Sequence, residues 1–213
     1  MLDLHLTRGE HNDWVTLRLP TSPAEIGEVY AWLDCISTCV DDTRIAAVSS
    51  SVPNIRQYIR NSDLNDIKKL NRLAGQIDSM DQSTAQTFAG ALDAESINEL
   101  DDVVRIAEHI SDYVRIKGVT SDRELGKYLL EHGFLEDCPE NVKPYLDTLA
   151  IGVEYYSKCG GAYTADGYVL KKENMMFLEA GEIVAQAKDQ EATSKLHLQT
   201  NSGTNGFQMG VMR

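Results

Sequence analysis

The spacing of apolar residues changes along this chain, and that change limits the folds it can adopt. Leu2, Leu4 and Leu6 alternate with polar residues, and the alternation recurs over residues 15–19, which is typical of the two strands of a hairpin. From about residue 63 onward the apolar residues recur at helical spacing instead. The chain is therefore expected to be an α+β protein with an α+β N-terminal domain, a central helical bundle and an α+β C-terminal domain.

The first segment predicts a small α+β domain over residues 1–61. Ser22 and Glu25 enclose Pro23 in the pattern of a capping box with proline at the first helical position, so a helix should begin here. Residues 43–50 are rich in β-branched and small apolar residues and are expected to form a third strand.

Residues 62–113 predict a small helical bundle. A short helix is expected over residues 88–92, and Ser96 with Glu99 has the spacing of a capping box that would open a third helix. Before these, one helix is expected to bury a face formed by Ile67, Leu70, Ala74 and Ile77.

Residues 114–171 predict a second α+β domain. Ser121 and Glu124 form another capping-box pattern, and Gly133 marks the end of the helix that follows. A second helical stretch is expected from Pro139 to Tyr145, and a third after a cap at Asp147. Residues 163–169, with Asp-Gly at their centre, predict a hairpin.

Residues 172–213 are expected to be a C-terminal extension. One helix is expected over residues 175–187. Residues 194–213 are rich in Ser, Thr, Asn, Gln and Gly, a composition that predicts a flexible tail.

The chain carries neither a signal-peptide pattern at its start nor an apolar stretch of 18 residues. We therefore expect a cytoplasmic protein that does not enter the membrane. Its four cysteines, Cys35, Cys39, Cys138 and Cys159, are expected to be reduced thiols in that compartment.

The sequence offers no pattern that predicts catalysis. Its five histidines are scattered, without the spacing of a metal site, and no glycine-rich phosphate loop or nucleophile elbow occurs. We expect no enzyme activity, no metal and no cofactor. A hydrolase or nucleotide-binding enzyme is the alternative that a pocket with converging His and Asp side chains would favour.

Acidic residues gather in the predicted bundle. Between Arg72 and Arg115 nine carboxylates oppose one cation, Arg105, and the formal net charge of −13 belongs to the first 170 residues. Such a run is either an ordinary solvated face or a surface that attracts the basic clefts of DNA-binding proteins.

Six segments resemble the ArdA family of antirestriction proteins, in matching order and spacing over about 100 residues. They are residues 70–74 (LNRLA), 96–100 (SINEL), 125–128 (LGKY), 139–147 (PENVKPYLD), 150–152 (AIG) and 161–169 (GAYTADGYV). The resemblance implies an elongated chain of three small domains that forms a homodimer, mimics DNA and occupies the DNA-binding groove of a type I restriction–modification enzyme. It implies inhibition without chemistry and without binding to nucleic acid. The alternative is an acidic inhibitor of another DNA-targeting defence nuclease, such as an RNA-guided nuclease.

The resemblance also suggests which residues carry the function. Residues 135–148 correspond to the family's antirestriction motif near its dimer interface, which makes Leu135, Pro139, Val142, Tyr145, Leu146 and Asp147 the expected dimer contacts. The acidic surface that would imitate DNA is expected to comprise Asp78, Asp81, Asp93, Glu95, Glu99, Asp101, Asp102, Glu108, Asp112, Asp122 and Glu124.

Overall fold

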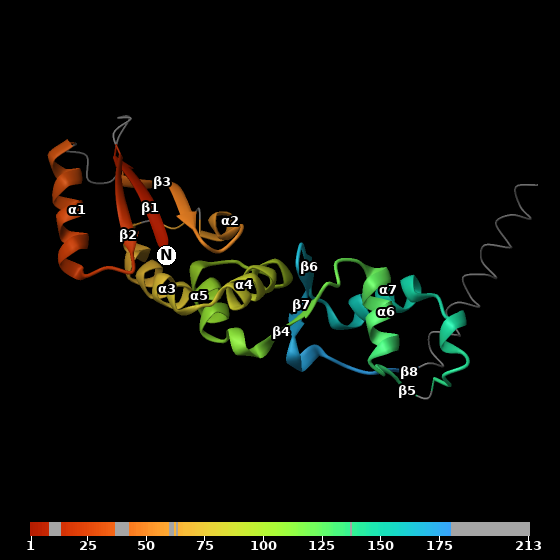
Figure 1. The fold of residues 1–213 in the computed structure, drawn as a ribbon. Helices are drawn as coiled ribbons and strands as arrows, with labels where there is room; N and C mark the ends of the chain where they lie inside the picture. The colour runs from red at the N-terminus through yellow and green to blue at the C-terminus, as the bar shows by residue number, and fades with distance from the viewer. Residues whose placement is uncertain (9–13, 37–42, 60–61, 63, 137, 180–213) are drawn as a thin grey trace, which may run out of the picture. The chain divides into compact units, whose positions relative to one another are not determined.

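The computed structural model (Figure 1) describes residues 1–8, 14–36, 43–59, 62, 64–136 and 138–179. These residues form seven α-helices, two antiparallel three-stranded sheets and one two-stranded parallel pair, which confirms the α+β class. The chain divides into two compact units: unit 1 comprises Met1–Thr120 and Cys159–Met175, and unit 2 comprises Ser121–Lys158 with the described residues 176–179. Among the described residues, none of the helices has the length and apolar character needed to cross a membrane.

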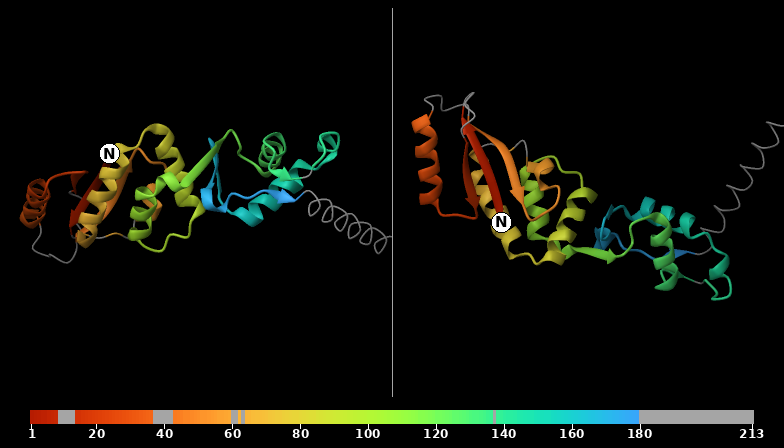
Figure 2. Two further views of the ribbon diagram at one scale, coloured as in Figure 1. Left: turned by 90° about the horizontal axis from the view of Figure 1, so that it is seen from below. Right: turned by 45° about the horizontal axis from the view of Figure 1, so that its top comes forward.

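The first sheet of unit 1 confirms the predicted hairpin and third strand. Its strands β1 (Leu2–Arg8), β2 (Trp14–Leu19) and β3 (Thr43–Ser50) run antiparallel in the order β2-β1-β3. Figure 2 shows these red and orange strands side by side. Alternation places the leucines of β1 and β2 on one face, and Leu2, Leu4, Leu6, Leu17 and Leu19 are buried there.

Two helices accompany this sheet, α1 (Pro23–Ile36) and α2 (Ile55–Ile59). The predicted capping box of α1 is confirmed: the Glu25 N–H donates to Ser22 Oγ at 3.3 Å, and the Ser22 N–H donates to Glu25 Oε2 at 3.1 Å. Leu33 of α1 is fully buried.

Three helices follow: α3 (Ile67–Ser79), α4 (Gln82–Ala94) and α5 (Leu100–Glu108), with a short 3-10 helix, η2 (Leu64–Asp66), before α3. All four apolar residues predicted for the buried face of α3 are buried. The helix predicted over residues 88–92 was too short, because α4 is capped by Asp81 and begins at Gln82, six residues before the predicted start. The predicted cap at Ser96 is wrong, since α5 begins after Glu99.

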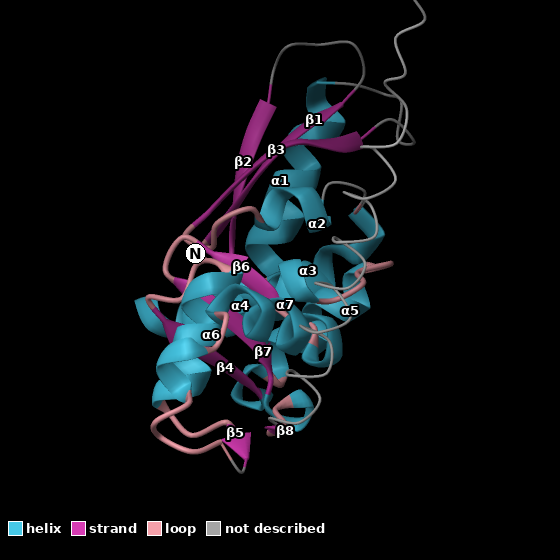
Figure 3. Cartoon of the chain, turned by 90° about the vertical axis from the view of Figure 1, so that its right-hand side faces the viewer, coloured by secondary structure: helices cyan, strands magenta, loops and turns pink. Residues whose placement is uncertain are grey.

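The second sheet of unit 1 joins two segments distant in sequence (Figure 3). Strand β4 (Tyr113–Lys117), which follows the 3-10 helix η3 (Ile110–Asp112), pairs antiparallel with β7 (Gly167–Lys171), and β7 also pairs with β6 (Ala162–Thr164). The β6–β7 pair confirms the predicted hairpin. Helix α4 packs on it, and a Cβ at Gly90 would lie 2.5 Å from Val169 Cγ2. The 3-10 helix η5 (Lys172–Asn174) ends this part of unit 1.

One buried cluster runs from β1 through α5 and includes Tyr113 and Val169. The boundary predicted after residue 61 therefore falls inside a continuous core of unit 1. The division into segments 1–61, 62–113, 114–171 and 172–213 stays a prediction.

Unit 2 contains α6 (Asp122–Glu131), β5 (Leu135–Glu136), the 3-10 helix η4 (Lys143–Tyr145), α7 (Thr148–Cys159, of which the last residue belongs to unit 1) and β8 (Leu178–Glu179). The caps predicted for α6 and α7 are confirmed, with Ser121 Oγ accepting from the Glu124 N–H at 3.4 Å and Asp147 Oδ1 from the Leu149 N–H at 2.9 Å. The expected helix from Pro139 is reduced to the three residues of η4.

The helix predicted over residues 175–187 is also wrong where the structure describes it, because β8 pairs in parallel with β5 there. Residues 180–187, and the predicted tail at 194–213, lie outside the described residues.

Helices α6 and α7 approach each other through two glycines. A Cβ at Gly126 would lie 1.8 Å from the carbonyl oxygen of Thr148, and a Cβ at Gly152 would lie 1.7 Å from that of Asp122. Because a side chain has no room at either position, the contact requires glycine on both helices. The packing of α6 against α7 thus explains why glycine stands at both positions.

Candidate functional site

The acidic surface of unit 1 is formed by the nine carboxylates between Arg72 and Arg115, all of them placed by α3, α4, α5 and the turns at their ends. The two other acidic residues predicted for the DNA-mimicking surface, Asp122 and Glu124, belong to unit 2 and lie in the first turn of α6. Negative charge in a first turn stabilises the helix dipole. Each of the nine in unit 1 has a local partner, and these partners divide them into three kinds.

The first kind caps helices. Asp102 Oδ2 accepts hydrogen bonds from the backbone N–H groups of Asn98 at 3.0 Å and Glu99 at 3.3 Å, and the Glu99 side chain completes a capping box at the start of α5. Those two backbone donors lower the pKa of Asp102. Asp81 accepts from the Thr84 N–H at 2.7 Å at the start of α4, which lowers the pKa of Asp81. The caps therefore keep two of the carboxylates ionised below the usual range of an aspartate.

The second kind pairs with cations of α3. Lys69 Nζ lies 2.6 Å from Asp101 Oδ2, and Arg72 pairs with Glu108, so two ion pairs connect α3 to α5. The hydrogen bond from Lys69 to Asp101 raises the pKa of Lys69. The sequence run gave no sign of these cations because they precede it, although Lys69 and Arg72 stand three residues apart and hence on one side of α3.

The third kind accepts a hydrogen bond from a tyrosine hydroxyl or has a side chain that is mostly exposed to solvent. The Tyr58 hydroxyl donates to Asp93 Oδ1 at 2.5 Å, and burial together with this contact raises the pKa of Tyr58 to about 12. Asp78 accepts from the amino group of Met1 at 3.3 Å. The side chains of Asp78, Asp101 and Asp112 are 62%, 54% and 66% exposed, so more than half of each of these three side chains is open to solvent.

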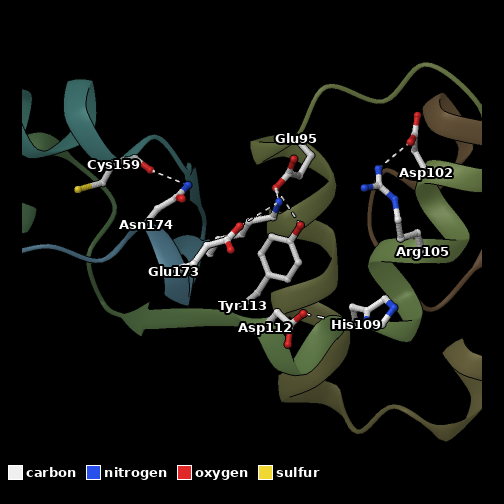
Figure 4. A network of polar contacts seen from close by, with 10 residues as sticks. Glu95, Asp102, Arg105, His109, Asp112, Tyr113, Cys159, Glu173 and Asn174 are labelled. Carbon is white, nitrogen blue, oxygen red and sulfur yellow. Dashed lines mark hydrogen bonds and ion pairs between the residues drawn. The ribbon is translucent and has the colours of Figure 1, made fainter.

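A cleft of about 500 Å³ opens at one end of the acidic surface. Its apolar part is formed by Ile106 and Tyr113, both buried. Figure 4 shows the Tyr113 hydroxyl directed at Glu95, with Arg105 and His109 on the neighbouring α5 and its C-terminal turn. The charged lining consists of Glu95, Asp112, Glu173, Arg105, Lys171 and Lys172, with His109. We call this site the Tyr113 cleft.

One wall of the Tyr113 cleft is a fixed polar network. Glu95 Oε1 accepts from the Tyr113 hydroxyl at 2.8 Å and lies 3.2 Å from Lys171 Nζ. Burial, and then the hydrogen bond to Glu95, raises the pKa of Tyr113. The phenol therefore stays neutral and continues to donate to Glu95 well into the alkaline range. No local sequence pattern indicates this cleft, because Tyr113 and Lys171 meet only through the pairing of β4 with β7.

The residues predicted as dimer contacts differ in accessibility within unit 2. Leu135 is buried, Leu146 is half-buried, and Pro139, Val142 and Asp147 are exposed. Tyr145 is 87% exposed. Their assignment to a dimer interface stays a prediction.

Among the described residues, His, Cys, Asp and Glu side chains form no group that could hold a metal ion. Cys35, Cys138 and Cys159 are free thiols, and Cys39 lies outside the described residues. A comparison with protein-family models finds no match for this chain, and a comparison with curated proteins finds none either.

Proposed function

We propose that this protein is a non-enzymatic inhibitor that mimics DNA and occupies the DNA-binding groove of a type I restriction–modification enzyme. The observation that carries the proposal is the density of ionised carboxylates in unit 1, where helix caps and short ion pairs hold the acids in place. The ArdA-like segments support the choice of target. The proposal includes the cytoplasm of a bacterial host as the site of action.

The charge available suits this role only if two chains act together. Duplex DNA carries one charge per about 1.7 Å of axis, whereas one acid per helical turn supplies one per about 5.4 Å. A single helix is therefore too sparse. Two chains, each with a net charge of −13, match the phosphates of about 13 base pairs, which is why the proposal includes a homodimer.

Exposed apolar side chains in unit 2 support a self-association surface. Of the ten large apolar side chains that stand exposed in the described residues, seven belong to unit 2. Leu149, Val153 and Tyr156 recur at positions i, i+4 and i+7 of α7, a spacing that aligns them on one helical face. Such a stripe is typical of an interface.

Charge placed on this stripe should separate the dimer. Replacing Leu149 and Val153 together by glutamate is expected to yield a species with the mass of one chain, 23.7 kDa, where the unchanged protein shows twice that mass. Light scattering coupled to size-exclusion chromatography measures this. Trp32→Glu is the matched control, because Trp32 is an exposed apolar residue of α1. A double variant that stays dimeric would show that the interface lies elsewhere.

Titration against two defence nucleases tests the proposed function itself. Purified protein is added to a type I restriction enzyme and, separately, to an RNA-guided nuclease, with DNA cleavage as the readout. We expect inhibition of the type I enzyme that weakens at least tenfold between about 50 and 200 mM salt, because fixed charges and released counterions drive the binding. Inhibition that does not change with salt concentration would contradict DNA mimicry. Selective inhibition of the RNA-guided nuclease would show that this nuclease is the target instead.

A further inference from the structure

The Tyr113 cleft differs in charge from the protein around it. The chain carries a net charge of −13, yet the cleft is lined by as many lysines and arginines as carboxylates. Its volume of about 500 Å³ lies within the range of small-molecule sites, about 300–1,000 Å³. The cleft thus combines a ligand-sized space with a local charge balance that the acidic surface lacks.

Part of this charge is already committed to the fold. Glu95 is held by the Tyr113 hydroxyl and by Lys171. The Lys171 ammonium also lies 3.7 Å from Glu173 and 6.0 Å from the centroid of the Tyr113 ring. The charged and polar groups of this wall therefore bind one another, which leaves them less able to bind a ligand.

Other groups in the cleft retain capacity for a ligand. A guanidinium has five N–H donors, and Arg105 uses Nη2 for Asp102 at 2.7 Å while its side chain stays largely exposed. The negatively charged Asp112 is also exposed, and its Oδ2 lies 4.0 Å from His109 Nδ1. Arg105 and Asp112 line the same cleft as the Tyr113 ring, so an exposed cation and an exposed anion border one space.

We propose that the Tyr113 cleft binds a small zwitterion of the amino-acid class, an amino acid or dipeptide with an apolar side chain. Its carboxylate pairs with Arg105, which recognises carboxylates through parallel N–H donors. The ammonium group pairs with Asp112, and the apolar side chain packs on Ile106 and Tyr113. A purely anionic ligand would be repelled by the three carboxylates of this lining, and a purely cationic ligand would be repelled by its three permanent cations. The inference is independent of the proposed inhibitor function.

Calorimetric titration with the dipeptide alanyl-phenylalanine tests this site on the unmodified protein. We expect saturable binding with a Kd of about 1 mM or tighter, and chemical-shift changes at the amides of Ile106 and Tyr113. N-acetylation removes the ammonium and C-terminal amidation removes the carboxylate, and each is expected to weaken binding about tenfold. Equal affinity for all three peptides, or no saturation by about 10 mM free dipeptide, would overturn the proposal.

Two variants connect each end of the ligand to its residue. Arg105→Gln should weaken binding of the free dipeptide about tenfold and leave the amidated peptide unaffected, because that peptide has no carboxylate to lose. Asp112→Asn should likewise weaken binding of the free dipeptide about tenfold and leave the N-acetylated peptide unaffected, because that peptide has no ammonium group. Arg56→Gln, an exposed arginine of α2, is the control and should bind like the unchanged protein. If a variant fails to fold, the three peptides still decide the proposal on the unmodified chain.

Discussion

Alanine at position 152 is expected to destabilise unit 2 severely. The added Cβ would lie 1.7 Å from the carbonyl oxygen of Asp122, and main-chain atoms of α6 are not free to rotate away as a side chain would be. Insertion of a methyl group into a packed interior commonly costs about 1–3 kcal/mol, and we expect about 3 kcal/mol or more because the clash is with backbone. Urea unfolding followed by circular dichroism measures the loss, and Gly126→Ala should behave alike.

Gly75→Ala provides the matched control for this prediction. Gly75 lies inside α3, and a Cβ there would meet nothing within 4 Å. Alanine is the better helix former by about 0.5–1 kcal/mol, so this variant should be slightly more stable than the unchanged protein. If Gly152→Ala proved as harmless as Gly75→Ala, the close crossing of α6 and α7 would be disproved.

Neutralising the carboxylates that serve no cap should abolish most of the proposed inhibition without loss of fold. The suitable positions are Asp78, Asp101 and Asp112, which are exposed and lie outside the side-chain caps of α4 and α5. Changing all three to Asn reduces the net negative charge from −13 to about −10, and counterion release falls with each charge removed. We expect inhibition weaker by about tenfold or more at low salt, and a shallower dependence on salt.

The matched control variant keeps the number of carboxylates and changes only the length of the side chains that carry them. Asp78→Glu, Asp101→Glu and Asp112→Glu together preserve the net charge, so inhibition should stay within about threefold of the unchanged protein if the potential drives binding. A neutralised variant that inhibits fully would point to a small uncharged contact instead. Cleavage assays at two salt concentrations measure both variants.

Features encoded by neighbouring residues could be predicted from the sequence. The strands of the first sheet, the capping box at Ser22, and the caps at Ser121 and Asp147 follow from alternation and from spacings of two to four residues. The cap of α5 was misplaced because Ser96 and Glu99 also fit the capping pattern. The structure instead uses Glu99 with Asp102. Serine is a preferred N-cap residue and glutamate is not, so the local pattern favoured the wrong position.

Features that depend on distant pairing could not be predicted. Nothing near Tyr113 indicates that β4 pairs with a strand more than 50 residues later, so the Tyr113 cleft and the Glu95–Lys171 ion pair had no local signal. The same holds for Lys69 and Arg72, which moderate the acidic run from outside it. The acidic run is therefore visible in the sequence, but the cations of α3 that pair with two of its carboxylates are not.

The pairing of β4 with β7 has a consequence for the covalent continuity of the chain. Residues 121–158 leave unit 1 after β4 and the chain returns to the same sheet through β6 and β7. The segment is thus an insertion whose two ends are held by one ladder of main-chain hydrogen bonds. A protease that cut the exposed backbone around Pro139 would produce two fragments, each still contributing a strand to that ladder, and the nicked protein would travel as one particle until it was denatured.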